Sequence, residues 1–416
     1  MSDRHANAVS TTIPDLLIVG ASARACAFSA RMAGLVPVCF DQFADADLQA
    51  VADVRRVKRY PADLPIMAEE FPGVPWMYTG ALENYPAIVA KISETHPLIG
   101  NSPDVLHKIR DPILLARWLT ESGMNSLAVR PGDDAPPADG SWLIKPRRSA
   151  AGIGIHIWNE TVCHSIPDRR TDSFYFQEYC SGESHSALFT GDARSARLLG
   201  MTRQLVGCHE LNAIDFAYSG SIGVIPCEPI IRESIEQLGQ LLVERSGMSG
   251  LFGCDLIVDE RGIWLTEVNP RYTASAEIIE RATGQSTICE HLLGCRSVQP
   301  ELERLPLFER TSHEHLPNTK NRFSKFDEPM IYGKAILYSI REFIMPDLSE
   351  LSSPFQSPLE TSRWPAFADI PVPGTRIEQG HPICTLFASA TAVSDCQSRL
   401  FQIACDLTEV LAKSSR

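Results

Sequence analysis

Apolar residues in the first hundred positions come in short runs, separated by longer stretches of mixed polarity. Asp15–Gly20 and Val36–Asp41 are apolar runs of strand length, and the stretch between them is rich in small residues and ends at Gly34. This pattern predicts a helix between two buried strands. A WMYTG segment, a helix near Leu82–Ile92 and an HPLIG segment continue the alternation. Repeated strand–helix–strand units predict a parallel sheet of the α/β class.

The pattern changes after residue 101. Two proline-marked helix starts lie in residues 102–123, and Gly123 is a helix stop. From Ser141 to Gly207, short apolar runs separated by turn residues predict β-strands. A helix over Arg232–Ser246 then precedes a second pair of strands. The last part, roughly Pro329–Arg416, mixes strands with a closing helix.

Composition restricts the class of protein. A length of 416 residues favours two to three domains, and 44% apolar with 21% charged residues is typical of a globular chain. The polar start has no signal-peptide pattern, and no apolar run is long enough to span a bilayer, so we expect a cytoplasmic protein. The 12 cysteines form no CxxC pair, which favours reduced, buried thiols over a zinc site.

Net charge points to the kind of partner. A formal charge of −13 disfavours nucleic acid and anionic membranes. A highly phosphorylated ligand would therefore need a local cluster of cations.

The clearest chemical signal is a predicted hairpin in LFGCDLIVDERGIWLTEVNPR. If Asp259 and Ile263 flank a three-residue loop, Gly262 falls where such a loop needs a positive φ. The same register places Asp255 directly across from Glu267.

Four polar residues of this hairpin share one face, because side chains alternate along a strand. Asp255, Glu267 and Asn269 offer oxygen ligands without histidine or thiolate, a set that suits Mg²⁺ or Mn²⁺ bridging nucleotide phosphates. Arg271 adds a cation that suits the charge on a transferring phosphoryl group.

Two further motifs suit a nucleotide. WLIKPRRSAAGIGI places Lys145 on a strand, followed by a small-residue loop with Gly152 and Gly154, where backbone N–H groups can approach phosphates. This loop is not a Walker A motif, because the lysine precedes the glycines. In FYFQEYCSGESHSALF, a strand leads to Gln177–Tyr179 and then to Glu183, which could meet an adenine edge and the ribose hydroxyls.

Taken in chain order, these motifs resemble the ATP-grasp superfamily of ligases. The resemblance implies a Rossmann-like pre-ATP-grasp domain at 1–101 and an ATP-grasp domain with an α+β core at 102–300. A lid would cover about 125–183. A C-terminal α+β domain at 301–416, including a charged, proline-containing linker, is similar to the C-terminal region of related ligases and carboxylases.

The resemblance also implies roles for individual residues. Lys108 and Lys145 look like the family's two nucleotide-binding lysines, and Lys145 with Arg271 would be catalytic. The metal ligands would be Asp255, which is glutamate in many relatives, Glu267 and Asn269. The remaining contacts with ATP would be Ser149, Gly152, Gly154, Gln177, Glu178, Tyr179 and Glu183.

The substrate side is expected in the first domain. In ATP-grasp enzymes this domain usually lines the substrate, so Ser22 and Arg24 are candidate substrate contacts, as is Gln204 in the core. The loop DQFADADL, with three aspartates, is interpreted as a solvated loop.

The implied reaction uses MgATP to phosphorylate a small-molecule carboxylate. An amine then displaces phosphate from the acyl phosphate, which makes the chain a carboxylate–amine ligase with ATP and Mg²⁺ (or Mn²⁺) as cofactors. Relatives are often dimers, so the resemblance also allows a homodimer.

Three alternatives remain open from the sequence. A carboxylase of the biotin-carboxylase type would use bicarbonate. A nicotinamide-dependent dehydrogenase would bind NAD after Gly20, although GxSxR there is not GxGxxG. A nucleotide-binding regulator would have lost turnover.

Overall fold

The computed structural model describes residues 14–165, 171–299, 302–303, 308, 330–347 and 366–414. Its first part is a parallel sheet in the order β3-β2-β1-β4, as the alternating pattern predicts. The strands are β1 (Leu16–Gly20), β2 (Pro37–Asp41), β3 (Asp53–Arg56) and β4 (Trp76–Tyr78). Helices and one 3-10 turn connect them: α1 (Arg24–Met32), α2 (Ala46–Gln49), α3 (Leu64–Ala68), η1 (Leu82–Asn84) and α4 (Pro86–Ser93).

Two short helices lead out of this sheet. α5 (Pro103–Ile109) and α6 (Pro112–Glu121) both begin with proline, and the side chain of Asp111 caps α6 by accepting from the amides of Ile113 and Leu114. Proline at the first position of α6 ends the preceding helix, so the chain turns sharply at Arg110 and Asp111.

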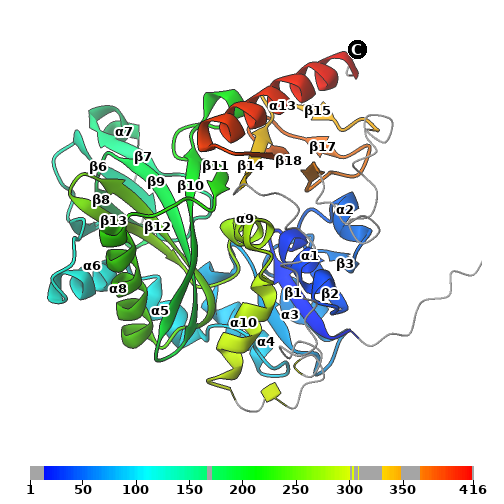
Figure 1. Cartoon of the computed structure of the whole chain (residues 1–416), viewed down its shortest axis with the longest axis horizontal. Coiled ribbons are helices and arrows are strands. Elements are labelled where there is room, and N and C mark those ends of the chain that lie inside the picture. The colour runs from blue at the N-terminus through cyan, green and yellow to red at the C-terminus, as the bar shows by residue number, and fades with distance from the viewer. Residues whose placement is uncertain are drawn as a thin grey trace, which may run out of the picture.

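A small antiparallel sheet follows, in the order β5-β8-β6-β7. Its strands are β5 (Val129–Pro131), β6 (Asp139–Pro146), β7 (His156–Asn159) and β8 (Phe174–Glu178), with helix α7 (Glu160–Ser165) and turn η2 (Thr171–Ser173). Its own apolar cluster includes Ile144, Trp158 and Phe176. This sheet forms a separate layer at the left edge of Figure 1.

The largest sheet is antiparallel and has eight strands within the described residues, in the order β13-β12-β9-β10-β11-β14-β18-β16. In that order the strands are β13 (Gly262–Asn269), β12 (Ser249–Asp259), β9 (Glu183–Asp192), β10 (Ala196–Val206), β11 (Tyr218–Gly223), β14 (Ile331–Tyr338), β18 (Pro382–Ala390) and β16 (Phe367–Ala368). Turn η3 (His209–Leu211) joins β10 to β11, and β15 (Phe343–Ile344) pairs separately with β17 (Arg376–Ile377).

Helices cover this sheet on both faces. α8 (Pro229–Ser246) packs with Phe189 and Phe252, while α9 (Ala274–Thr283) and α10 (Thr287–Arg296) pack between the sheet and α1. The closing helix α13 (Val393–Ser414) lies over β14 and β18, as Figure 1 shows in red. No helix in the described part of the chain is long and apolar enough to cross a membrane.

The C-terminal strands lie where the sequence pattern did not place them. β14 pairs with β11, so residues after 330 extend the same sheet that carries β12 and β13. The predicted C-terminal region therefore shares a sheet with the predicted core. The linker prediction falls mostly outside the described residues, and the domain boundaries stay predictions.

Candidate functional site

The hairpin of β12 and β13 sets Asp255 directly opposite Glu267, the predicted pairing. The turn itself is different, because Asp259 pairs with Gly262 and leaves a two-residue loop instead of three. A register shift between Asp255 and Leu256 adds the missing residue back. Gly262 has the expected positive φ, +125°. A short turn and a bulge together produce the pairing that the longer loop would give.

Two amides hold the Asp255 carboxylate. Asn269 Nδ2 donates to Asp255 Oδ2 at 3.0 Å, and Gln204 Nε2 donates to Asp255 Oδ1 at 2.9 Å. Burial and the nearby Glu267 raise the pKa of Asp255 to about 6. Gln204, a predicted substrate contact, therefore lies beside the acid pair.

Cations surround the other acid. Arg110 Nη1 donates to Glu267 Oε1 at 2.5 Å, and Lys145 Nζ donates to Gln177 Oε1 at 3.0 Å and to the carbonyl oxygen of Thr266 at 3.1 Å. Burial favours a higher pKa for Glu267, but the charges of Arg110 and Lys145 outweigh it and hold the pKa below its ordinary value. The Glu267 side chain remains 32% exposed, so a ligand can reach it.

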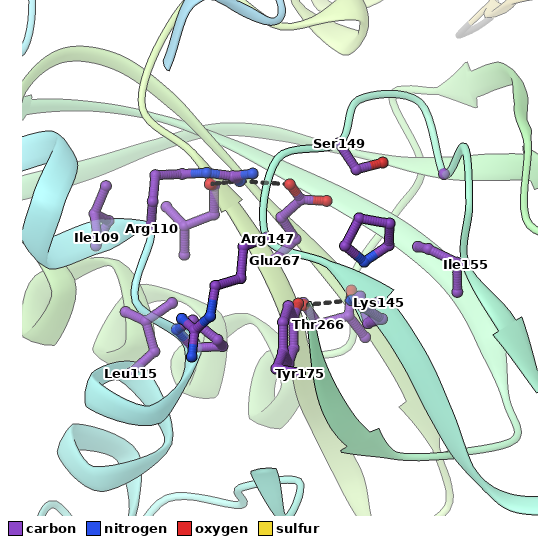
Figure 2. Close-up of a pocket in the computed structure, with 14 residues that line it drawn as sticks. Ile109, Arg110, Leu115, Lys145, Arg147, Ser149, Ile155, Tyr175, Thr266 and Glu267 are labelled. Atoms are coloured by element: carbon purple, nitrogen blue, oxygen red, sulfur yellow. Dashed lines mark hydrogen bonds and ion pairs between the residues drawn. The ribbon is translucent and has the colours of Figure 1, made fainter. Parts of the chain in front are cut away.

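Arg110, Lys145 and Glu267 line one pocket between the small sheet, β13 and the α5–α6 turn. Figure 2 shows Arg110 reaching toward Glu267 from one side, with Ser149 and Ile155 on the opposite wall and Lys145 beside Thr266. The lining residues are Ile109, Arg110, Pro112, Leu115, Lys145, Pro146, Arg147, Ser149, Gly152, Ile155, Tyr175, Thr266, Glu267 and Val268.

Arg271 joins the site to the N-terminal sheet. Its Nη2 donates to Asn269 Oδ1 at 3.1 Å and to Glu83 Oε1 at 2.8 Å. Burial favours a lower pKa for this guanidinium, but Glu83 and Glu267 raise it above its ordinary value. The arginine is thus a fixed cation one hydrogen bond away from the amide that holds Asp255.

The glycine loop between β6 and β7 is tightly constrained. Gly152 has φ +77°, and a Cβ there would lie 1.9 Å from the carbonyl oxygen of Phe216. Gly154 has φ +79° and packs against Pro146. The Ser149 hydroxyl donates to the carbonyl oxygen of Ile153 at 2.6 Å, which closes the loop on itself.

In the predicted adenine-binding segment, some backbone N–H groups already donate hydrogen bonds within the sheet. The backbone N–H of Glu178 donates to Ala128 and that of Tyr179 to Ser141, so these two amides are already used in the sheet. The Glu178 carboxylate accepts from the Ala128 amide at 3.0 Å. Tyr179 and Glu183 are exposed near this edge, and none of the three lines the pocket.

Lys108 does not reach the pocket, contrary to its predicted place. It is exposed on α5, while Arg110, two residues later, supplies the cation beside Glu267. Proline at position 112 turns the chain here, and that turn directs residue 110 inward. The helix-start signal at Asp111 and Pro112 was present in the sequence, but it does not say which basic residue points inward.

Arg24 is not available as a substrate contact. It is 1% exposed, and its guanidinium bonds Glu277 at 2.5 and 3.0 Å and Asp369 at 3.0 Å. Ser22 is exposed at the end of β1, where its carbonyl oxygen accepts from the Thr79 hydroxyl.

The aspartates of the DQFADADL loop are also buried or nearly so, which contradicts the solvated-loop interpretation. Asp41 accepts from the amides of Ala23, Phe43 and Ala44, and Asp47 accepts from those of Asp369 and Ile370. These carboxylates cap backbone groups of neighbouring segments, which explains their burial.

The donor set at the acid pair fits a hard divalent cation. Within the described ranges, no group of three or more histidine, cysteine, aspartate and glutamate side chains is arranged to hold a metal. Mg²⁺ is commonly held by one or two carboxylates and completed by substrate phosphates and water. Asp255 and Glu267 therefore suit an ion that binds together with a nucleotide.

Comparison with known proteins identifies the domain around this pocket. Residues 110–275 match the family described as the ATP-grasp domain, so the chain contains an ATP-grasp domain. An uncharacterized protein of Methanocaldococcus jannaschii is 23% identical over 306 residues, which cover 72% of this chain and 66% of that protein. The chain thus matches slightly less than two thirds of that relative's length.

Solved structures share the whole fold. L-amino acid ligase from Bacillus licheniformis has a TM-score of 0.64 and 13% identity, with 95% of this chain and 98% of that one covered. N5-carboxyaminoimidazole synthase from Aspergillus clavatus, solved with ADP and 5-aminoimidazole ribonucleotide, has a TM-score of 0.63 and 12% identity, with 95% and 98% covered.

The biotin carboxylase domain of Hydrogenobacter thermophilus 2-oxoglutarate carboxylase, solved with MgADP, ADP and bicarbonate, has a TM-score of 0.61 and 15% identity, with 94% and 89% covered. The predicted fold class is confirmed: the chain has the ATP-grasp fold of these ligases and carboxylases.

Proposed function

We propose that the protein is an ATP-dependent ligase that phosphorylates a substrate carboxylate and joins the acyl group to an amine. The observation that carries this proposal is the pocket in the ATP-grasp domain, which Glu267, Lys145 and Arg110 line. Asp255 lies opposite Glu267 on the neighbouring strand, and Asn269 connects it to Arg271. Paired acids ringed by cations suit the triphosphate of ATP and the metal that accompanies it.

The described contacts suggest a role for each group. Asp255 and Glu267, with Asn269, would hold Mg²⁺, which neutralises charge on the phosphates. Lys145 and Arg110 would orient the β- and γ-phosphates. Arg110 would take the place that the family resemblance gave to Lys108.

The reaction would begin with in-line attack of a substrate carboxylate on the γ-phosphorus, and ADP would leave. Arg271, held by Glu83 and Asn269, would stabilise the negative charge of the acyl phosphate. Catalysis would then rest on positioning and fixed charge, without a covalent protein nucleophile.

The small sheet β5-β8-β6-β7 would close over the nucleotide. Its glycine loop already contacts the N-terminal part of the chain, because Asn84 Nδ2 donates to the carbonyl oxygen of Ser149 at 3.0 Å. Closure would exclude water, which otherwise hydrolyses an acyl phosphate.

A second candidate acid is bicarbonate. The biotin carboxylase neighbour was solved with bicarbonate bound, and the two folds are alike over most of both chains. None of the structures named above is a dehydrogenase. The predicted cytoplasmic location and homodimer stay predictions.

A phosphate-release screen tests the proposal. Purified protein with MgATP is offered pooled carboxylic acids against pooled amines, with bicarbonate alone as a separate arm. We expect release that requires both an acid and an amine. Release with bicarbonate and no amine would favour the carboxylase. In a separate thermal-shift measurement, a rise in unfolding temperature with NAD, and none with ADP and Mg²⁺, would overturn the ligase proposal.

The matched control is Glu267→Gln, which keeps the shape of the side chain and removes its charge. We expect it to abolish phosphate release while thermal unfolding stays cooperative. Turnover by this variant at the parent rate would contradict the metal assignment.

A further inference from the structure

The loop after β4 brings a buried carboxylate to Arg271. Glu83, on η1, is 1% exposed, and its Oε1 lies 2.8 Å from Arg271 Nη2. The loop packs closely on the guanidinium, since a Cβ at Gly80 would lie 3.6 Å from Arg271 Cζ. A segment of the N-terminal part therefore forms one wall beside the catalytic arginine.

One oxygen of this carboxylate lacks a hydrogen-bond partner within the described part of the chain. Among the described residues, nothing donates a hydrogen bond to Glu83 Oε2, although the atom is buried. A buried carboxylate oxygen without a donor is costly, and such a group calls for a ligand or a role in chemistry. Glu277 offers a contrast, since both of its oxygens bond Arg24.

The position of Glu83 relative to the acid pair suggests a role for its Oε2 atom. Arg271 Nη2 bonds Glu83 on one side and Asn269 on the other, and Asn269 in turn bonds Asp255. A reacting acyl phosphate held by Arg271 would thus have the metal acids on one side and Glu83 on the other. A nucleophile approaching from the N-terminal side would meet the free oxygen.

We propose that Glu83 binds the amine nucleophile and removes its proton, an inference that rests on the proposed ligase function. The ammonium group donates to Oε2 and gives up one proton to the carboxylate. The freed lone pair forms the new C–N bond to the acyl carbon. The C–O bond to phosphate breaks, its electron pair goes to the phosphate, and the second nitrogen proton leaves with that phosphate.

The neighbouring side chain suits this arrangement. Asn84 accepts from Arg110 Nη2 at 3.1 Å and donates to Ser149, so the backbone next to Glu83 is tied to both walls of the nucleotide pocket. The carboxylate is consequently held in place when the pocket is assembled. A fixed general base of this kind contributes on the order of 10²- to 10⁴-fold to a proton-transfer step.

The test uses Glu83→Gln and measures two steps separately: formation of the acyl phosphate, and transfer of the acyl group to the amine. Parent and variant are incubated with MgATP and a pool of the twenty L-amino acids, once alone and once with hydroxylamine. Hydroxylamine is already uncharged at about pH 7 and captures an acyl phosphate without a base. ADP with Mg²⁺ is titrated into both proteins to confirm that the nucleotide pocket is intact.

We expect Glu83→Gln to keep hydroxamate formation within about threefold and to lose coupling to amino acids by about 100-fold. The loss should shrink as the pH rises and the free amine becomes abundant. Glu83→Asp, which keeps the carboxylate, should recover part of the coupling.

Equal loss of both half-reactions would overturn the inference, because it would make Glu83 only a support for Arg271. Unchanged coupling would overturn it as well. If the parent forms no hydroxamate with any amino acid, and none with the acids of the phosphate-release screen, the proposed function fails first and the inference fails with it.

Discussion

The protein contains two clusters of carboxylates and cations that look alike in composition and differ in access. In the pocket, Arg110 pairs with Glu267, whose side chain is 32% exposed. In the second cluster, Arg24 and Glu277 pair with exposures of 1% and 2%, and Asp369 and Lys334 complete it. The first cluster lines a cavity, whereas the second is buried apart from Asp369, whose side chain is 25% exposed.

The difference shows what a charged cluster needs in order to act on a ligand. The Arg24 cluster connects α1 to α9 and to the C-terminal segments, and its charged groups form ion pairs with one another. The pocket keeps an exposed acid and cations that face the cavity. Exposure to the cavity, and not the number of charges, separates the Arg110–Glu267 pair from the Arg24–Glu277 pair.

The largest expected effect is on stability, in the closed cluster. Arg24→Met removes the cation that bonds both oxygens of Glu277 and leaves this buried carboxylate only its longer contacts with Lys334 and Arg281. The loss should cost about 3 kcal/mol in the free energy of unfolding. Arg110→Met, in the pocket, should cost less than Arg24→Met, because the Glu267 side chain is 32% exposed. Chemical denaturation of both variants measures the two costs.

The order of the two variants should be reversed for activity, with the larger loss in Arg110→Met. Arg110→Met is expected to lower phosphate release strongly, while Arg24→Met, if folded at low temperature, should keep most of it. Equal destabilisation by the two substitutions would contradict the distinction between an open and a closed cluster.

A second effect concerns the loop that closes the pocket. Gly152→Ala combines a strained φ with a clash against Phe216, and the displaced loop should lower kcat/KM for MgATP by roughly 100-fold. Gly247, at the end of α8, has the same φ of +77° and nothing within 4 Å of an added Cβ. Gly247→Ala should cost on the order of 1 kcal/mol in stability and leave kcat/KM unchanged.

Steady-state kinetics with both glycine variants distinguishes the cause. If Gly247→Ala lowered kcat/KM as much as Gly152→Ala, general strain would explain the loss, and the loop would have no special role in binding phosphates.

The smallest effect is a pH dependence at the edge of the closed cluster. Burial, together with Asp369, Asp47 and Asp41, raises the pKa of Asp45 to about 9. The folded protein therefore keeps a proton that the unfolded chain releases near pH 4, so this group makes stability fall as the pH rises from about 4 to 9.

Asp45→Asn cannot lose that proton. Its stability relative to the parent should increase with pH between 6 and 8, by at most about 1.4 kcal/mol per pH unit. Thermal and urea unfolding across this range measure the trend, and Asp133→Asn, at an exposed position, is the matched control. If the stability difference between Asp45→Asn and the parent does not change with pH, the cluster accommodates the charged form of Asp45.

Local sequence rules predicted much of the site. Alternation along two strands placed Asp255 and Glu267 on one face, and the pairing held although the turn is shorter than predicted, because a bulge compensates. A bulge depends on side-chain packing and has no simple sequence signature. The same rules located the loop with Gly152 and the parallel sheet.

The parts that the sequence missed depend on contacts between distant segments. β14 joins β11 across more than a hundred residues, and Asp369 reaches Arg24 from the far end of the chain. A burial state set by such partners cannot be read from the residues around Arg24. Glu83 was missed for the same reason, since its partner Arg271 lies in another part of the fold.

The most direct test of the central claim is a crystal structure with Mn²⁺ and a non-hydrolysable ATP analogue. Anomalous scattering locates the metal without reference to the protein. The account predicts a Mn²⁺ ion bound by both Asp255 and Glu267, with the terminal phosphates beside Lys145 and Arg271. A nucleotide bound elsewhere, or a metal that touches neither carboxylate, would contradict it.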